Sequence, residues 1–211
     1  MDEMVKYKAA DGVDVTLTAE EVVKYVATGD GKPTDRDVAV FLATCQARGL
    51  NPLAGDAYMV TMGGRTTVMT SKDYFVRVAR SKTSNRGWKA GVIVVDRQGE
   101  LRRHEGACYG SSTERLVGGW AEVYDHVTDE YVDSLGEVHV SSELVTFSDE
   151  VALAEYDKRS GLWKTMPGTM IRKVALVHAL REAYPGSFSG VYDQSEMPSV
   201  DVAARIVEDA E

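Results

Sequence analysis

The strongest periodic pattern of apolar residues lies between residues 163 and 184, in WKTMPGTMIRKVALVHALREAY. From residue 169 to residue 184, apolar side chains fall at nearly every angle of a 3.6-residue helical wheel. Such a helix is expected to lie at the centre of the fold, covered by other elements on several sides. Its apolar residues are Met170, Ile171, Val174, Ala175, Leu176, Val177, Ala179, Leu180 and Ala183.

Two cations share one side of this predicted helix. Lys173, Val177, Arg181 and Tyr184 follow one another at spacings of four, four and three residues, which places them along one stripe. Residues 158–181 contain six Lys and Arg and no Asp or Glu. A buried stripe of one sign needs an anionic partner. That partner is either a ligand or a set of carboxylates from the same chain, and composition leaves both open.

The N-terminal quarter carries one strand signal and two helix signals. Residues 1–15 are expected to form an extended arm or edge strand, because apolar residues alternate at Val13, Val15 and Leu17. Capping boxes at residues 18–21 and 34–37 predict two helices, each followed by a glycine. The core side of the second helix is expected to comprise Val38, Phe41, Leu42 and Cys45.

The middle of the chain is rich in strand and turn signals. Residues 56–62 and 65–70 flank a Gly-Gly pair, and residues 89–95 and 101–109 flank Asp96-Arg-Gln-Gly99; both patterns predict hairpins. Leu116 to Val127 is expected to form a long strand. Between the hairpins, Ser71 is expected to cap a helix whose inner side holds Tyr74, Phe75 and Val78.

Antiparallel strands with helices before and after them predict an α+β fold, with a central antiparallel β-sheet, hairpins and a central buried helix near residues 169–184. The 211 residues are 44% hydrophobic and 27% charged, as expected for one core domain at residues 1–197 and an acidic C-terminal tail at residues 198–211. The chain contains neither an apolar run of the roughly 18 residues that cross a bilayer nor an apolar signal core, which predicts a cytoplasmic protein.

The distribution of charge is more informative than the formal net charge of −9. Residues 65–103 contain ten Lys and Arg against three acids, whereas residues 122–157 contain eleven acids and no Lys or Arg. Residues 193–211 add six acids and one Arg. Basic blocks separated by an acidic block predict a molecule with a positive face and a negative face. Such a positive face can bind phosphates although the whole chain is acidic.

Familiar catalytic and metal-binding motifs are missing. The four histidines have no H-x-x-x-H spacing and no Cys-x-x-Cys companion, and Cys45 and Cys108 set no disulfide framework. Phe188 stands where a nucleophile elbow needs serine. The loop at residues 29–34 lacks the spacing of a phosphate loop. We therefore expect no enzyme activity, no catalytic residue and no metal site.

Several short motifs follow one another in a specific order and spacing. They are Gly49-Leu-Asn-Pro52, Lys72-Asp-Tyr-Phe75 with Arg77 and Ala79, Gly118-Gly-Trp-Ala121, Trp163 with Pro167, Met170, Lys173 and Ala175, Ala179-Leu-Arg-Glu-Ala-Tyr-Pro185, and Gly190-Val-Tyr192 leading to Glu196. Over about residues 18–197, this set resembles the phage single-strand annealing proteins of the RecT and Redβ (Bet) superfamily.

The resemblance implies an ATP-independent recombinase that binds single-stranded DNA, anneals complementary strands and assembles into rings or filaments on DNA. It implies no required cofactor, with Mg²⁺ acting only as a counterion of DNA, and its partners would be single-stranded DNA, annealed duplex and further copies of the chain. Longer members carry a C-terminal module that recruits an exonuclease and the host single-strand binding protein. Here only residues 198–211 follow the core pattern, which leaves those two partnerships open.

The two basic blocks supply the candidate DNA contacts. Phosphates are expected to bind to the cations that lie within or beside the family-like motifs, namely Lys72, Arg77, Lys164, Arg172, Lys173 and Arg181. Arg172 lies off the stripe and is also a candidate for a structural role. The groove is expected to be supported by Trp163, Pro167 and Met170, with Trp163 as a hydrophobic plug beneath the central helix.

Self-assembly is also expected, with the acidic residues 122–157 of one copy facing a basic patch of the next. Two other functions remain as alternatives. In one, the chain is an oligomeric scaffold that binds no nucleic acid and whose basic blocks pair with its own acidic block. In the other, it is a metal-dependent nuclease that uses acidic residues of the middle segment.

Overall fold

The computed structural model describes residues 4–188, and these divide into two compact units. Unit 1 comprises residues 4–78 and unit 2 residues 79–188. Mixed helices and antiparallel strands confirm the predicted α+β class. The predicted boundary between a core at 1–197 and a tail at 198–211 lies outside the described residues and stays a prediction.

Unit 1 begins with a two-stranded hairpin. Strand β1 (Met4–Lys8) pairs antiparallel with β2 (Asp14–Thr18), whereas the sequence analysis predicted a single arm or edge strand. The turn forms because Gly12 adopts a φ of 86° and the backbone N–H of Ala9 donates to the carbonyl of Val13. The predicted alternation holds inside β2, where Val15 and Leu17 are buried.

Both predicted capping boxes are present. The first starts α1 (Ala19–Glu21), which continues as one turn of π-helix, η1 (Val22–Val26), and then as β3 (Ala27–Gly29). The second starts α2 (Asp35–Arg48), whose buried side comprises the four expected residues. The Thr34 hydroxyl and backbone N–H lower the pKa of the Asp37 carboxyl by hydrogen bonding to it.

Replacing Thr34 with alanine is expected to lower the free energy of unfolding by about 1 kcal/mol, because the backbone N–H of Asp37 loses its capping oxygen. Thr34→Ser retains that oxygen and should stay close to the parent. Urea denaturation of both variants measures the difference. Equal losses for alanine and serine would show that the capping bond contributes nothing.

The remaining elements of unit 1 form a three-stranded sheet in the order β3-β4-β5. The predicted hairpin is formed by β4 (Ala57–Met62) and β5 (Arg65–Thr70), and β3 lies parallel to β4. A short 3-10 helix, η2 (Pro52–Ala54), precedes it. Helix α3 (Lys72–Ser81) follows, with the Ser71 hydroxyl accepting from the backbone N–H of Tyr74, and it continues from unit 1 into unit 2.

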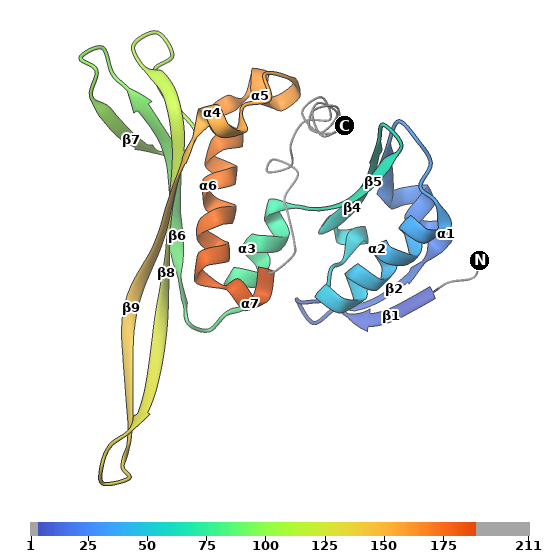
Figure 1. Ribbon diagram of the computed structural model, residues 1–211, viewed down its shortest axis with the longest axis horizontal. Helices are drawn as coiled ribbons and strands as arrows, with labels where there is room; N and C mark the ends of the chain where they lie inside the picture. The colour runs from blue at the N-terminus through green and yellow to red at the C-terminus, as the bar shows by residue number, and fades with distance from the viewer. Residues whose placement is uncertain (1–3, 189–211) are drawn as a thin grey trace, which may run out of the picture. The chain divides into compact units, whose positions relative to one another are not determined.

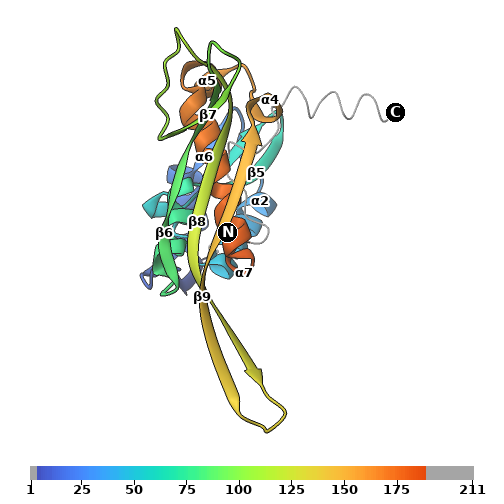
Figure 2. The same ribbon diagram turned by 90° about the vertical axis from the view of Figure 1, so that its left-hand side faces the viewer.

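Unit 2 is built on an antiparallel four-stranded sheet in the order β7-β6-β8-β9 (Figures 1 and 2). Its strands are β6 (Asn85–Val95), β7 (Leu101–Glu105), β8 (Arg115–Val132) and β9 (Val138–Ala152). Strand β8 extends five residues beyond its predicted end. Strand β9 was not predicted, and it carries several acids of the acidic block at residues 122–157.

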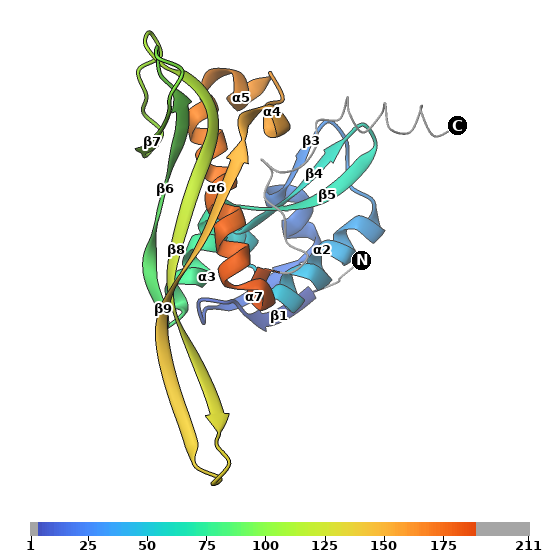
Figure 3. The ribbon, with the colours of Figure 1, turned by 60° about the vertical axis from the view of Figure 1, so that its left-hand side comes forward.

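Helix α6 (Pro167–Ala183) lies along one face of this sheet (Figure 3). It is preceded by α4 (Leu153–Tyr156) and α5 (Gly161–Thr165) and followed by α7 (Pro185–Phe188). The predicted central helix is therefore confirmed, with a start two residues earlier at Pro167. No described helix is long and apolar enough to span a bilayer.

The backbone of α6 approaches β8 closely at Gly119. A Cβ added to Gly119 would lie 2.6 Å from the carbonyl oxygen of Ile171. We expect Gly119→Ala to cost about 1–3 kcal/mol of unfolding free energy, because helix and strand must move apart. Gly186→Ala is the control, since nothing lies within 4 Å of its added Cβ. Thermal denaturation compares the two, and a parent-like melting of Gly119→Ala would contradict the close approach.

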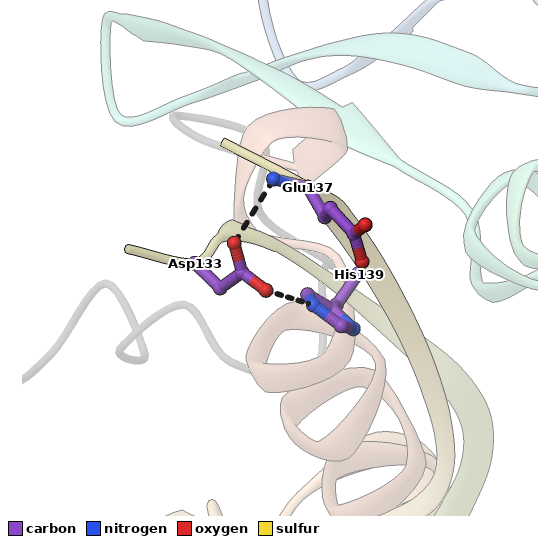
Figure 4. Close-up of side chains that lie close together, drawn as sticks. All are labelled: Asp133, Glu137 and His139. Carbon is purple, nitrogen blue, oxygen red and sulfur yellow. Dashed lines mark hydrogen bonds and ion pairs between the residues drawn. The ribbon is translucent and has the colours of Figure 1, made fainter. Parts of the chain in front are cut away.

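Beyond the end of α6, β8 and β9 continue as a two-stranded hairpin, which we call the distal ribbon (residues 126–144; Figures 1 and 3). At its tip, Asp133 accepts from the backbone N–H groups of Leu135 and Glu137 and contacts His139 Nε2 at 2.8 Å (Figure 4). The His139 bond is the main cause of a lowered pKa of Asp133. Asp133, Glu137 and His139 thus close the turn.

Candidate nucleic-acid interface

A basic segment joins α3 to β6 within unit 2. Residues 80–89 read RSKTSNRGWK and contain four cations and no acid. Among the described residues, none of these cations pairs with a carboxylate, and three of the four are exposed. They are Arg80, Lys82, Arg86 and Lys89. An unpaired positive segment of this kind is suited to binding phosphates.

The same segment presents an aromatic ring. Trp88 is half-buried, and the guanidinium of Arg80 lies 5.2 Å from its ring centroid. A ring held in this way by a cation is a surface on which a base can stack, whatever its identity. Cations and an accessible aromatic side chain are therefore adjacent.

A hydrogen-bonded network joins the basic segment to the end of α6. The side-chain amide of Asn85 donates to the hydroxyl of Tyr184 at 2.7 Å, and that hydroxyl donates to Asp125 at 3.1 Å. Burial raises the pKa of Tyr184, so the hydroxyl keeps the proton that it donates. Arg181 lies one helical turn before Tyr184. The two basic blocks of the sequence therefore approach each other at this network.

The predicted stripe on α6 is more buried than a groove lining would be. Val177 and Tyr184 are buried, and Lys173 and Arg181 are half-buried with interactions inside the chain. Arg172 donates from Nε to the carbonyl of Ala90 in β6 at 3.0 Å. This bond gives Arg172 the structural role considered for it in the sequence analysis. The contact of these three cations with DNA stays a prediction.

The two candidates from unit 1 differ in their surroundings. Lys72 begins α3 and forms an ion pair with its neighbour Asp73 at 3.1 Å. Arg77 forms an ion pair with Asp56, which is 2% exposed, and lies 3.7 Å from Asp11. Arg77 thus neutralises a buried carboxylate that would otherwise be costly. Its phosphate contact stays a prediction.

The predicted support residues lie in and beside α5. Trp163 is 4% exposed, and Met170 is buried on α6. Pro167 is the first residue of α6, where its missing N–H costs no helical hydrogen bond. Lys164, next to Trp163, is exposed. These positions favour Trp163 as part of the core and leave Lys164 accessible to a ligand.

Some cations of the first basic block are neutralised by the acidic block. Arg103 of β7 pairs with Glu122 and Glu150 and lies 5.4 Å from the ring of Trp120. Arg102, whose side chain points to the other face of β7, pairs with Asp96 of its own block at 2.6 Å. Both cations of β7 are therefore neutralised, and this strand is a weaker candidate for phosphate binding than the basic segment.

The cations of the basic segment were not among the predicted phosphate contacts, because only cations within or beside the family-like motifs were selected. The signal was present, because residues 80–89 combine four cations, a tryptophan and no acid. The fold decides which cations of this block are available to a ligand, because most of those on β7 and α3 have acidic partners.

Comparison with known proteins identifies the family of this chain. The model of the RecT family matches residues 24–208, which is most of the chain. An uncharacterized protein of Ureaplasma parvum serovar 3 is 27% identical over 168 residues, covering 72% of this chain and 57% of the relative. The chain thus spans little more than half the length of this curated relative. The match to the family model shows that the chain belongs to the RecT family, whose members are single-strand annealing proteins of DNA recombination.

Proposed function

We propose that this protein binds single-stranded DNA through the basic segment and anneals complementary strands without hydrolysing a nucleotide. The observation that carries the proposal is the set of four cations at residues 80–89, which have no carboxylate partner among the described residues. One of them, Arg80, lies over the half-buried ring of Trp88. Membership of the RecT family supports the same function.

Contacts to phosphate carry no sequence information, so such a surface accepts any strand. The cations screen the repulsion between two polyanions as they approach. The base edges stay available for pairing, and correct pairs are selected because each stacked step gains about 1.4 kcal/mol. Stacking on Trp88 adds about 1–3 kcal/mol for the base that it contacts. The exposed Lys164 and the half-buried Lys173 and Arg181 are kept in this proposal as further phosphate contacts.

This mechanism requires no reaction centre, and no cofactor enters it. The protein supplies screening and alignment, and base pairing supplies the free energy. Mg²⁺ acts as a counterion of DNA. Because one protomer covers only a few nucleotides, several protomers must act side by side on a strand of useful length.

The experiment is the binding of a fluorescently labelled single strand at increasing salt, without ATP. The proposal predicts a linear fall of log affinity against log salt, at about −0.7 per phosphate contact. Binding that is absent, or that does not depend on salt, would contradict it. Strand cleavage in the presence of Mg²⁺ would instead support the nuclease.

A second candidate, an oligomeric scaffold without nucleic acid, is favoured by one observation. Arg102, Arg103 and Arg77 each pair with acids of the same chain. The scaffold therefore accounts for part of the first basic block. It does not account for the basic segment, and the salt titration distinguishes the two functions.

A further inference from the structure

One face of the distal ribbon exposes several apolar side chains. Val132 of β8 lies directly opposite Val138 of β9, and Val140 follows on the same face, opposite Glu130. Their exposed fractions are 63%, 58% and 66%, and that of Leu135 in the turn is 85%. Leu144, further along this face of β9, is 53% exposed. No described part of the chain covers these side chains.

The register shows that this is the face of the sheet away from α6. Asp149 of β9 bonds to His178 of α6, and Asp125 of β8 bonds to Tyr184 at the end of that helix. These residues differ by an odd number of positions from the ribbon valines, and the β8–β9 register is continuous. Because side chains alternate between faces, the valines point to the opposite side. The apolar face is therefore not an extension of the α6 core.

A two-stranded ribbon that leaves the body of its sheet is marginally stable in water. Exposed apolar patches of this kind mark interaction sites. Five acids and no Lys or Arg lie within residues 126–144. This charge disfavours DNA and anionic lipid as occupants, and it favours a protein surface that is both apolar and basic.

On η1 in unit 1 the chain carries an exposed apolar surface with one cation, which follows Glu20 and Glu21 of α1. Val23 and Tyr25 are 47% and 65% exposed, and Lys24 lies 5.1 Å from the ring centroid of Tyr25. Val22 and Val26 are buried and hold this turn against unit 1. Lys24 has no carboxylate partner among the described residues. Exposed apolar side chains and an unpaired cation thus match the ribbon in chemistry.

We propose that the apolar face of the distal ribbon docks on η1 of a second copy of this chain. The inference rests on the proposed function, in which several protomers act side by side, and it identifies the surfaces that join them. Because the ribbon and η1 are different surfaces, each copy can dock its ribbon on one neighbour and bind the ribbon of another neighbour on its own η1. Such head-to-tail contacts generate rings or filaments.

The first test replaces Val138 and Val140 together with threonine, which retains the β-branched shape and changes only polarity. The control is Leu101→Thr on β7, an exposed apolar residue of a strand outside the ribbon. Light scattering with annealed duplex follows assembly. We expect the protein concentration at half-assembly to rise at least about tenfold for the double variant and to stay unchanged for the control. Unchanged assembly of the double variant would overturn the inference.

The second test places a photo-crosslinking amino acid at Leu135 and mixes isotopically heavy and light copies. Cross-linked heavy–light peptides that pair the ribbon with residues 22–26 are expected. Cross-links only within one copy, or only to DNA, would overturn the inference.

Binding of a short labelled single strand to the double valine variant distinguishes the two proposals. Loss of assembly with parent-like strand binding supports the docking surface. If the parent itself binds no strand, the proposed function fails. If the parent binds strands but the double valine variant assembles like the parent, only the proposed docking surface is wrong and the proposed function stands.

Discussion

Replacing Trp163 with alanine is expected to lower the free energy of unfolding by about 3–5 kcal/mol, while the folded variant binds single-stranded DNA like the parent. The indole is 4% exposed, so its removal leaves a cavity beside α6. Its Nε1 is buried and has no hydrogen-bond partner among the described residues, so it contributes no polar contact. Chemical denaturation and DNA titration below the melting temperature measure both quantities.

Trp163→Phe is the matched control. Phenylalanine retains most of the apolar volume and removes a buried N–H whose unsatisfied state costs about 1–3 kcal/mol. Its stability should therefore stay much closer to that of the parent than the stability of Trp163→Ala. A Trp163→Ala variant that melts like the parent but binds DNA weakly would place the ring on the nucleic acid and contradict the core assignment.

Removing the four cations of the basic segment is expected to weaken single-strand binding by about a hundredfold at low salt and to reduce the salt slope by about 3. The variant combines Arg80→Ala, Lys82→Ala, Arg86→Ala and Lys89→Ala. These side chains have no carboxylate partners among the described residues, and the two bonds that Arg86 donates to the carbonyls of Thr83 and Asn85 are exposed. The fold should therefore remain intact. Fluorescence anisotropy over a range of salt concentrations gives both quantities, and circular dichroism checks the fold.

The control for this variant removes paired cations of the same basic block. Arg102→Ala with Arg103→Ala deletes two charges that are bonded to Asp96, Glu122 and Glu150. Since those charges are already neutralised, the salt slope should change little. Equal effects of the two variants would show that overall charge, and not the basic segment, controls binding.

Much of the fold could be predicted because its signals are local. The capping boxes depend on residues three positions apart, and α6 is identified by a density of apolar residues that only a covered helix tolerates. Helix α6 starts earlier than predicted because Pro167 is accommodated at its first position. In a sequence, a proline usually indicates a helix boundary, but it fits the first turn of a helix. The β1–β2 turn was missed although Asp11-Gly12 is a turn signal.

The distal ribbon could not be predicted because it lacks the pattern that reveals strands. Alternation identifies a strand when one face is buried. From residue 128 to residue 132 every side chain is exposed, and β9 has few buried residues. Its acidic residues therefore resembled a solvated segment. These strands are identified only by their backbone pairing in the structure.

The site was predicted as two charge blocks with six candidate cations, but the sequence does not show which cations already have partners within the chain. Which cations are available depends on contacts between residues distant in sequence. Arg77 meets Asp56, and Arg172 meets the carbonyl of Ala90, which is 82 positions away. No periodicity contains this information. Residues 80–89 show the converse case, since their cations have no acid nearby in sequence or, among the described residues, in space.

The most direct test of the central claim is annealing without a nucleotide. Two complementary oligonucleotides, one with a donor dye and one with an acceptor, are added in succession to the protein, and energy transfer is followed in the absence of ATP. The account predicts that the parent accelerates annealing and that the variant lacking the four cations of residues 80–89 does not, whereas the Arg102 and Arg103 control does. Annealing that requires ATP, or that is equally fast with the four cations removed, would contradict it.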